Sequence, residues 1–130
     1  MAATLQRLQV IKGSEDSCKS HEKVFDVACS DGLAVDPATH RCPDNGARVN
    51  LADCSFDPDV GASQLRTLWQ DPEFQADQEA FYYVRVLEIP TPRWTAFDVL
   101  EYGAAIPEGM EDSDWVAQQR AYTSPIWYTP

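Results

Sequence analysis

Four polar or aromatic residues in and after one apolar segment could bind an anion. The segment 81–89, FYYVRVLEI, contains Arg85 and Glu88, and the following PTPRW ends in Arg93 and Trp94. A guanidinium is a planar donor that matches a carboxylate or phosphate, and an indole offers a flat apolar wall. We therefore take Arg93 and Trp94, with Arg85 and Glu88, as candidate residues of a binding site or of the rim of a pocket.

The same residues also have a structural interpretation. Arg85 and Glu88 point to opposite faces of an extended segment, so they do not pair directly with each other. A charge on a mostly apolar face needs a partner, and Asp26 would meet Arg85 if their two strands were neighbours in a sheet. In this interpretation Arg85 forms a structural ion pair and Trp94 fills the core.

Sequence motifs for catalysis are absent, so we assign no catalytic residue and no metal ligand within this chain. It has no G-x-S-x-G nucleophile and no glycine-rich phosphate loop. His21 and His40 lie outside H-x-H and H-E-x-x-H patterns. Acidic clusters at 15–16, 57–59 and 111–114 lack the spacing of a calcium loop. A small hydrolase with a metal site made of both histidines and acidic loops is a less favoured hypothesis.

The four cysteines favour disulfide bonds over a zinc site. Ten, twelve and eleven residues separate neighbouring cysteines, whereas zinc sites usually contain a short C-x-x-C type of pair. An even number of cysteines at long spacing is typical of an oxidising compartment. The sequence leaves all pairings open, and free thiols are a further alternative. Our preferred pairing joins Cys29 to Cys42 across a polar excursion and leaves Cys18 with Cys54.

The composition predicts one acidic globular domain. The chain has 130 residues, 44% of them hydrophobic, and its net charge is −11. This charge repels phosphate backbones and anionic membranes, so we expect no nucleic-acid partner. No apolar run approaches the roughly 20 residues that span a bilayer, so we expect no membrane span. The start of the chain lacks the basic and apolar regions of a secretory signal.

Alternation of apolar and polar residues predicts most of the strands. Residues 5–11 and 23–29 are expected to form a hairpin with a long polar loop at 13–20. Segment 81–89 is apolar on both faces, which predicts a central strand with both faces covered. The end of the chain predicts an edge strand interrupted by Pro125.

Two short helices are expected beside these strands. Segment 61–70 has three apolar residues at helical spacing, and the helix would cover the second face of the central strand. The other helix would begin with Thr95 as its N-cap and stop at Gly103. The predicted fold is therefore mainly β, a β-rich α+β arrangement of an antiparallel sheet or sandwich with two short helices and long loops.

A resemblance to a known family rests on five segments: LQRLQVIKG, EKVFDVACSDG, VGASQL, AFYYVRVLEIPTPRW and RAYTSPIWYTP. Together they resemble a bacterial family catalogued as domain of unknown function 3604, from about residue 4 to residue 130. The resemblance implies that residues 1–130 are the single C-terminal domain of a larger hydrolase similar to the polymerase and histidinol phosphatase (PHP) superfamily. It places a divalent metal and its ligands in a missing upstream domain. It also implies a periplasmic or secreted parent protein.

The expected function is that of a non-catalytic C-terminal domain. It would pack against a phosphoesterase-like hydrolase domain, which would be its partner, and would rim the pocket of that domain. Without this cover the isolated chain would be marginally stable or self-associating. The alternative is an independent module that binds carbohydrate or protein through its aromatic residues. The two functions differ in whether these aromatics form one exposed planar strip or a scattered interface.

Overall fold

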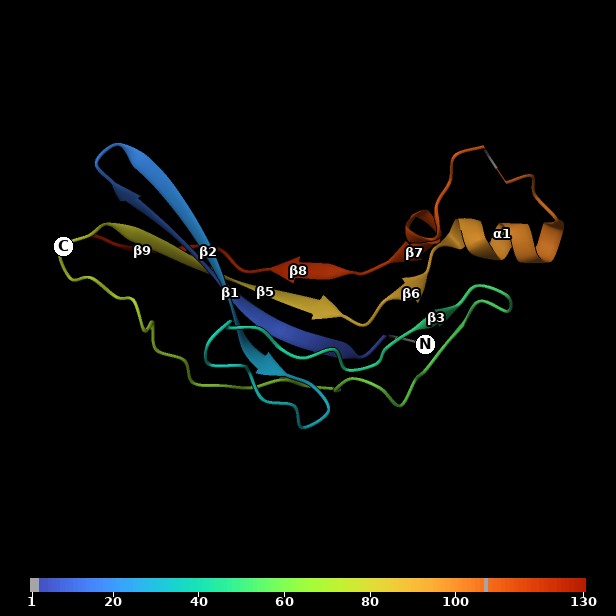
Figure 1. Ribbon diagram of the computed structural model, residues 1–130, viewed down its shortest axis with the longest axis horizontal. Coiled ribbons are helices and arrows are strands. Elements are labelled where there is room, and N and C mark those ends of the chain that lie inside the picture. The colour runs from blue at the N-terminus through green and yellow to red at the C-terminus, as the bar shows by residue number, and fades with distance from the viewer. Residues whose placement is uncertain (1–2, 107) are drawn as a thin grey trace.

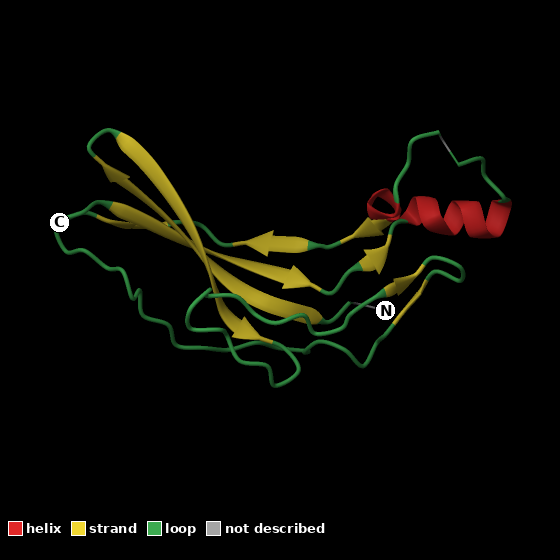
Figure 2. Cartoon of the chain, viewed as in Figure 1, coloured by secondary structure: helices red, strands yellow, loops and turns green. Residues whose placement is uncertain are grey.

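The body of the molecule is a five-stranded antiparallel sheet, shown by a computed structural model that describes residues 3–106 and 108–130 (Figures 1 and 2). Its strands are β1 (Leu5–Asp16), β2 (Lys19–Cys29), β5 (Ala80–Glu88), β8 (Arg120–Tyr122) and β9 (Ile126–Tyr128). The strand order is β2-β1-β5, and the short strands β8 and β9 both pair with the other edge of β5. The mainly β, antiparallel prediction is confirmed, as are the central strand and the edge strand interrupted at Pro125. Met1, Ala2 and Pro107 lie outside the described residues. The first two belong to the start of the chain, where no secretory signal is expected.

The hairpin of β1 and β2 is longer and its turn tighter than the sequence predicts. The two strands pair from Asp16 and Lys19 at the tip to Arg7 and Cys29, with one bulge after Leu8. Residues 17 and 18 form the turn, and both have positive φ. A two-residue turn of this kind has a twist that matches the twist of the two strands. The predicted loop at 13–20 is therefore wrong, because ladder hydrogen bonds continue through polar sequence.

The predicted helix at 61–70 is also wrong, because this segment has no helical turn and is irregular apart from a bridge between Ala62 and Leu5. It runs along one side of the sheet, as the green trace in Figure 1 shows. Trp69 packs between Phe25 and Tyr82, at ring-centroid distances of 5.2 and 6.5 Å, while Leu68 is 100% exposed. The apolar residues thus point in opposite directions, and one large ring covers the sheet in place of a helical stripe.

The single α-helix of the described residues, α1 (Trp94–Tyr102), stands at the end of the molecule opposite the tip of the hairpin (Figure 1). Its N-cap is Arg93 rather than the expected Thr95. The stop at Gly103 is confirmed, since this glycine is left-handed and its N–H donates to the Val99 carbonyl at 3.1 Å. The remaining elements are β3 (Val49–Asn50), β4 (Ser55–Phe56), β6 (Thr91–Pro92), the 3-10 helix η1 (Asp112–Trp115) and β7 (Val116–Ala117).

The two faces of the sheet have different surroundings. Val10 lies in register with Phe25 and Val84, and this face is covered by the long connection between β2 and β5. Ile11 lies in register with Val24 and Tyr83 on the opposite face. Among the described residues no helix and no strand from outside the sheet makes a substantial contact with β1 or β5, and we call the face that bears Tyr83 the open face. The expected cover on both faces of β5 is therefore wrong for the described residues, because one face is covered by the connection and the other carries aromatic side chains on the open face.

No helix in the described part of the chain is long and apolar enough to cross a membrane.

Candidate functional site

Four aromatic side chains form a continuous strip on the open face. Ring centroids are 5.1 Å apart between Trp127 and Phe81, 6.4 Å between Phe81 and Tyr83, and 6.3 Å between Tyr83 and Tyr122. The rings of Phe81 and Tyr83 differ in plane by only 8°. Trp127 is 71% exposed and Tyr122 is 57% exposed. We call these four residues the aromatic strip, whose two ends are exposed and whose middle residues, Phe81 and Tyr83, are half-buried.

Strand register explains why these four residues meet. Phe81 and Tyr83 are alternate residues of β5, so they share a face. Trp127 of β9 lies opposite Phe81, and Tyr122 of β8 lies opposite the next residue on that face, Arg85. The strip was not expected from the sequence, because it depends on the pairing of both short C-terminal strands with β5. Phe81 and Tyr83, two aromatic residues at alternate positions of one strand, were the sign of the strip that the sequence offered.

Gly13 lets the Phe81 ring lie across β1. The two residues are paired in the ladder, and a Cβ on Gly13 would come within 2.1 Å of the Phe81 ring. This close approach, rather than an unusual backbone angle, makes glycine necessary here. The ring can therefore lie close to the backbone and present its outer side to solvent.

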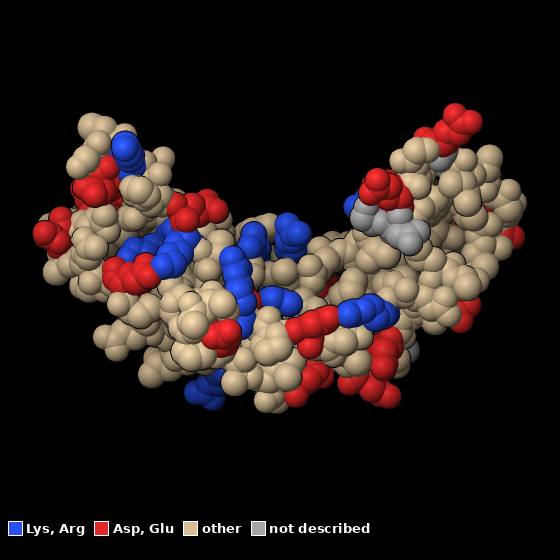
Figure 3. All heavy atoms as spheres, in the orientation of Figure 1, with Lys and Arg blue, Asp and Glu red and all other residues tan. Residues whose placement is uncertain are grey.

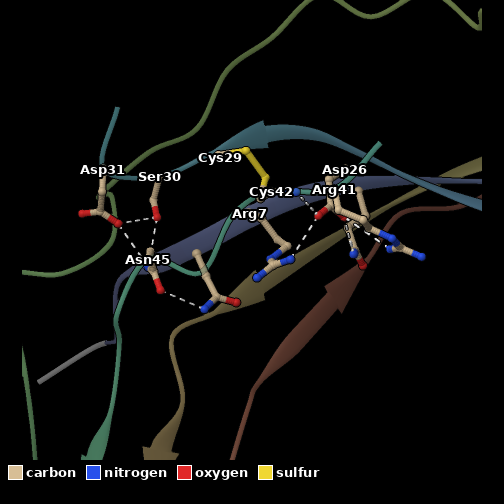
Figure 4. The surroundings of a disulfide bond; sticks show 10 residues. Arg7, Asp26, Cys29, Ser30, Asp31, Arg41, Cys42 and Asn45 are labelled. Atoms are coloured by element: carbon tan, nitrogen blue, oxygen red, sulfur yellow. Dashed lines mark hydrogen bonds and ion pairs between the residues drawn. A yellow bond between two sulfur atoms is a disulfide. The ribbon is translucent and has the colours of Figure 1, made fainter. Parts of the chain in front are cut away.

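Asp26 is the centre of a polar cluster that includes Arg7, Arg41 and Cys42 (Figure 4). Its side chain is fully buried. Arg7 donates to Asp26 Oδ2 at 3.0 Å, the backbone N–H of Cys42 donates to the same oxygen at 2.7 Å, and Arg41 Nη1 lies 3.7 Å from Oδ1. The Cys29–Cys42 disulfide ties the loop that supplies Cys42 and Arg41 to the end of β2 (Figure 4). The disulfide therefore helps to hold two partners of the carboxylate in place.

Arg85 joins this cluster through Gln9 and not through a direct ion pair. Its Nε donates to Gln9 Oε1 at 2.7 Å, and Gln9 Nε2 donates to Asp26 Oδ1 at 2.6 Å. The expected direct contact with Asp26 is wrong, because β1 lies between β2 and β5. Within the described residues the two terminal amino groups of Arg85 have no hydrogen-bond partner. The guanidinium is thus oriented from one side and free on the other.

The four arginines on this side of the sheet form a basic region on an acidic protein. Figure 3 shows Lys and Arg side chains gathered in a hollow above the middle of the sheet. Arg120 is exposed and lies opposite Leu87, on the same face as Arg85. We call Arg7, Arg41, Arg85 and Arg120 the arginine cluster. Against a net charge of −11, this local excess attracts a single anionic group.

Arg93 and Trp94 line a groove at the base of α1. The groove is open, has a volume of about 890 Å³ and extends to Arg120. Arg93 Nε donates to the Val116 carbonyl at 3.1 Å. Trp94 is 74% exposed, so the structure excludes its interpretation as a core residue. The two residues retain the exposure that a pocket rim requires.

Glu88 belongs to neither group of residues. It is half-buried at the end of β5, and its backbone carbonyl accepts a hydrogen bond from Gln118 Nε2 at 3.0 Å. Its carboxylate makes no hydrogen bond or ion pair with any described residue. The structure therefore separates the four candidates, with Arg93 and Trp94 together, Arg85 in the arginine cluster and Glu88 apart.

Of the two expected disulfides, one is formed. Cys29 and Cys42 are bonded, as preferred. The pairing of Cys18 with Cys54 is wrong, and both are free. Because β1 and β2 continue to the tip of the hairpin, Cys18 lies in the exposed turn, whereas Cys54 is buried beside β4.

A buried ion pair holds the connection between β2 and β5, which we call the covering connection, against the covered face of the sheet. Lys12 Nζ donates to Asp71 Oδ2 at 2.6 Å and to the Glu73 carbonyl at 2.8 Å, and Tyr82 Oη donates to the same Asp71 oxygen at 2.7 Å. Burial alone would raise the pKa of Asp71, but the hydrogen bonds from Lys12 and Tyr82 lower it overall. Burial, followed by the hydrogen bond to Asp71, raises the pKa of Tyr82 to about 12. This network is structural and lies away from the aromatic strip.

The histidines are separated by the fold. His21 lies on β2 near the hairpin tip, whereas the His40 carbonyl accepts a hydrogen bond from the Asp26 N–H and the His40 ring packs on Phe25 at 5.1 Å. These two points of β2 are five residue steps apart along the strand, roughly 16 Å. Among residues 3–106 and 108–130 no group of three or more His, Cys, Asp or Glu residues could hold a metal ion.

Comparison with known proteins gives a family. A family model described as "Protein of unknown function (DUF3604)" matches residues 1–130. No curated protein and no solved structure matches the chain. Because the family model covers all 130 residues, this chain belongs to the DUF3604 family of proteins of unknown function.

Proposed function

We propose that this chain is a non-catalytic C-terminal domain that packs against a metal-dependent hydrolase domain of the PHP type and contributes to the rim of its pocket. The exposed helix α1 is the observation that carries the proposal. Of its nine residues only Ala96 is buried. Trp94, Leu100 and Tyr102 are 74%, 48% and 78% exposed. With Phe97, which is also exposed, they form what we call the α1 surface.

The short length of α1 supports packing of this helix against a second domain. An isolated helix of this length is unstable in water and depends on packing of an apolar side. The inner side of α1 makes only a small apolar contact region, where Ala96 and Val99 face Leu51 and Trp115 around a cavity of about 210 Å³. Large exposed apolar surface on a small domain usually marks an interface. A second domain on the α1 surface would supply the missing cover.

The groove at the base of α1 supports a role at a pocket rim. The Nη groups of Arg93 have no partner among the described residues, and Trp94 stands beside them. A phosphoester is anionic, and an arginine fork suits its oxygen atoms. The PHP type of the partner domain, and a divalent metal within it, rest on the sequence resemblance.

The proposal is tested by mixing the chain with a separately purified hydrolase domain from a longer family member. Size-exclusion chromatography with light scattering should show a one-to-one complex. The double variant Phe97→Ser/Leu100→Ser should lose it, and Leu68→Ser, at a fully exposed residue of the covering connection, should retain it. Absence of a complex, or equal loss with Leu68→Ser, would refute packing through α1.

A further inference from the structure

We propose that the open face of the sheet binds an acidic sugar of the uronate class. The pyranose ring would stack on the aromatic strip, and its carboxylate would be bound by the arginine cluster. This site lies on the sheet and not on the α1 surface. Arg120 is shared with the groove at the base of α1, so sugar binding is tested on the isolated chain, without a hydrolase domain.

The aromatic strip offers apolar surface for sugar stacking, mainly at its exposed ends. The rings of Phe81 and Tyr83 are nearly parallel and half-buried, and the exposed rings of Trp127 and Tyr122 are tilted from their neighbours by 47° and 44°. Such rings present a broad apolar surface to the C–H groups of a pyranose. The hydroxyl groups of Tyr83 and Tyr122 have no partner in the described part of the chain, so they can bond sugar hydroxyls. The row thus combines stacking surface with hydrogen-bonding groups at its edge.

The arginine cluster indicates that the bound sugar carries a negative charge. Arg85 and Tyr122 are ladder neighbours, so the end of the strip lies beside a guanidinium. Gln9 holds Arg85 through Nε, which leaves the planar pair of terminal amino groups free for a carboxylate. Asp26 neutralises only one of the four positive charges in the cluster. A neutral sugar would leave this arrangement unused.

A peptide fits the surface less well than a sugar. An extended peptide usually binds by adding a strand to a free sheet edge. The β8–β9 edge is interrupted around Pro125, and on the β2 edge the Asp26 N–H already bonds the His40 carbonyl at 2.9 Å. The accessible feature is thus the face of the sheet, where side-chain rings and guanidinium groups recognise the ligand.

The test measures binding of three tetramers to the isolated chain by isothermal titration calorimetry. Tetragalacturonate is the acidic sugar, cellotetraose is its neutral counterpart, and tetraglutamate is an acidic peptide. Tetragalacturonate should bind more tightly than either of the others. No binding of tetragalacturonate would overturn the proposal. Equal or tighter binding of tetraglutamate would also overturn it and would identify the surface as a site for acidic peptides.

Matched variants locate the site. Trp127→Ala and Arg85→Lys should each weaken tetragalacturonate binding by about tenfold or more, since each removes stacking or a bidentate contact. Tyr102→Ala on α1 and Arg66→Lys on the covering connection remove comparable groups elsewhere and should leave binding unchanged. If the Arg85 variant fails to fold, Arg120→Gln at an exposed position takes its place with the same expected loss. Equal weakening by the control variants, or none by the strip and cluster variants, would refute the site.

Discussion

Arg85 and Asp26 lie two strands apart and are joined through Gln9, whose side-chain amide accepts a hydrogen bond from Arg85 and donates one to Asp26. The carboxylate is fully buried, whereas the far side of the guanidinium is free. A buried anion therefore orients an arginine that faces solvent on the open sheet face. The same carboxylate also holds the loop of Cys42, so one residue connects the disulfide to the arginine cluster.

Replacing Asp26 should destabilise the fold. We expect Asp26→Asn to lower the free energy of unfolding by about 3 kcal/mol, because it leaves the charge of Arg7 without its buried partner. Urea unfolding measures the change. Asp77→Asn, at an exposed carboxylate, should alter it by less than about 0.5 kcal/mol. A loss below about 1 kcal/mol at Asp26 would mean that the cluster contributes little to stability.

The thiols should differ in reactivity. A thiol reagent should modify Cys18 in the native protein and Cys54 only after unfolding, because the first is exposed and the second is buried. Cys29 and Cys42 should react only after reduction, which should cost about 3 kcal/mol by releasing a loop of this length. Mass spectrometry of labelled peptides measures all four sites. Native labelling of Cys29 or Cys42, or protection of Cys18, would contradict this assignment.

Tyr82 should ionise well above an ordinary tyrosine. Its pKa is raised to about 12 by burial and by the bond to Asp71, against about 10 for a free tyrosine. Because the folded-state pKa is raised, the neutral form stabilises the fold fully below about pH 10, and this stability is lost as the pH rises through about 12. Tyrosinate absorbance should show one late step that Tyr82→Phe removes. Tyr122→Phe should leave that step in place, and a late step that persists in Tyr82→Phe would exclude Tyr82.

Gly13 and Phe81 should be energetically coupled. Gly13→Ala should destabilise the chain by about 1–3 kcal/mol, because the new methyl group overlaps the Phe81 ring. In a Phe81→Ala background the same change should cost much less, since the ring is gone. Urea unfolding of the two single variants and the double variant gives the coupling. Equal costs of Gly13→Ala in both backgrounds would show that the contact does not restrict this position.

The parts of the fold that follow from period-two alternation were predictable. Both long hairpin strands and the central strand at 81–89 were expected, and the Cys29–Cys42 bridge was the preferred pairing. Length and turn position were less predictable, because the polar residues 13–20 give no apolar pattern while their backbones still pair. Ladder hydrogen bonds depend on the partner strand, which local sequence does not specify.

The helix predicted at 61–70 failed for a different reason. Three apolar residues at helical spacing cannot distinguish a helix from an extended cover that uses only some of them, and here Trp69 is packed while Leu68 is in solvent. The candidate site was likewise only partly predictable. Arg85, Arg93 and Trp94 were chosen from residue type, but the aromatic strip and the Gln9 connection depend on strand order. That order follows from non-local pairing of β8 and β9 with β5.

Amide hydrogen exchange of α1 tests packing on a hydrolase domain most directly. It would be followed by mass spectrometry in the isolated chain and in its complex with the hydrolase domain of a longer family member. We predict that amides of Trp94–Tyr102 exchange rapidly in the isolated chain, because the apolar side chains of the helix are exposed, and become strongly protected in the complex. Unchanged exchange in α1 upon mixing, or protection that appears only on the covering connection at 61–70, would contradict the proposed function.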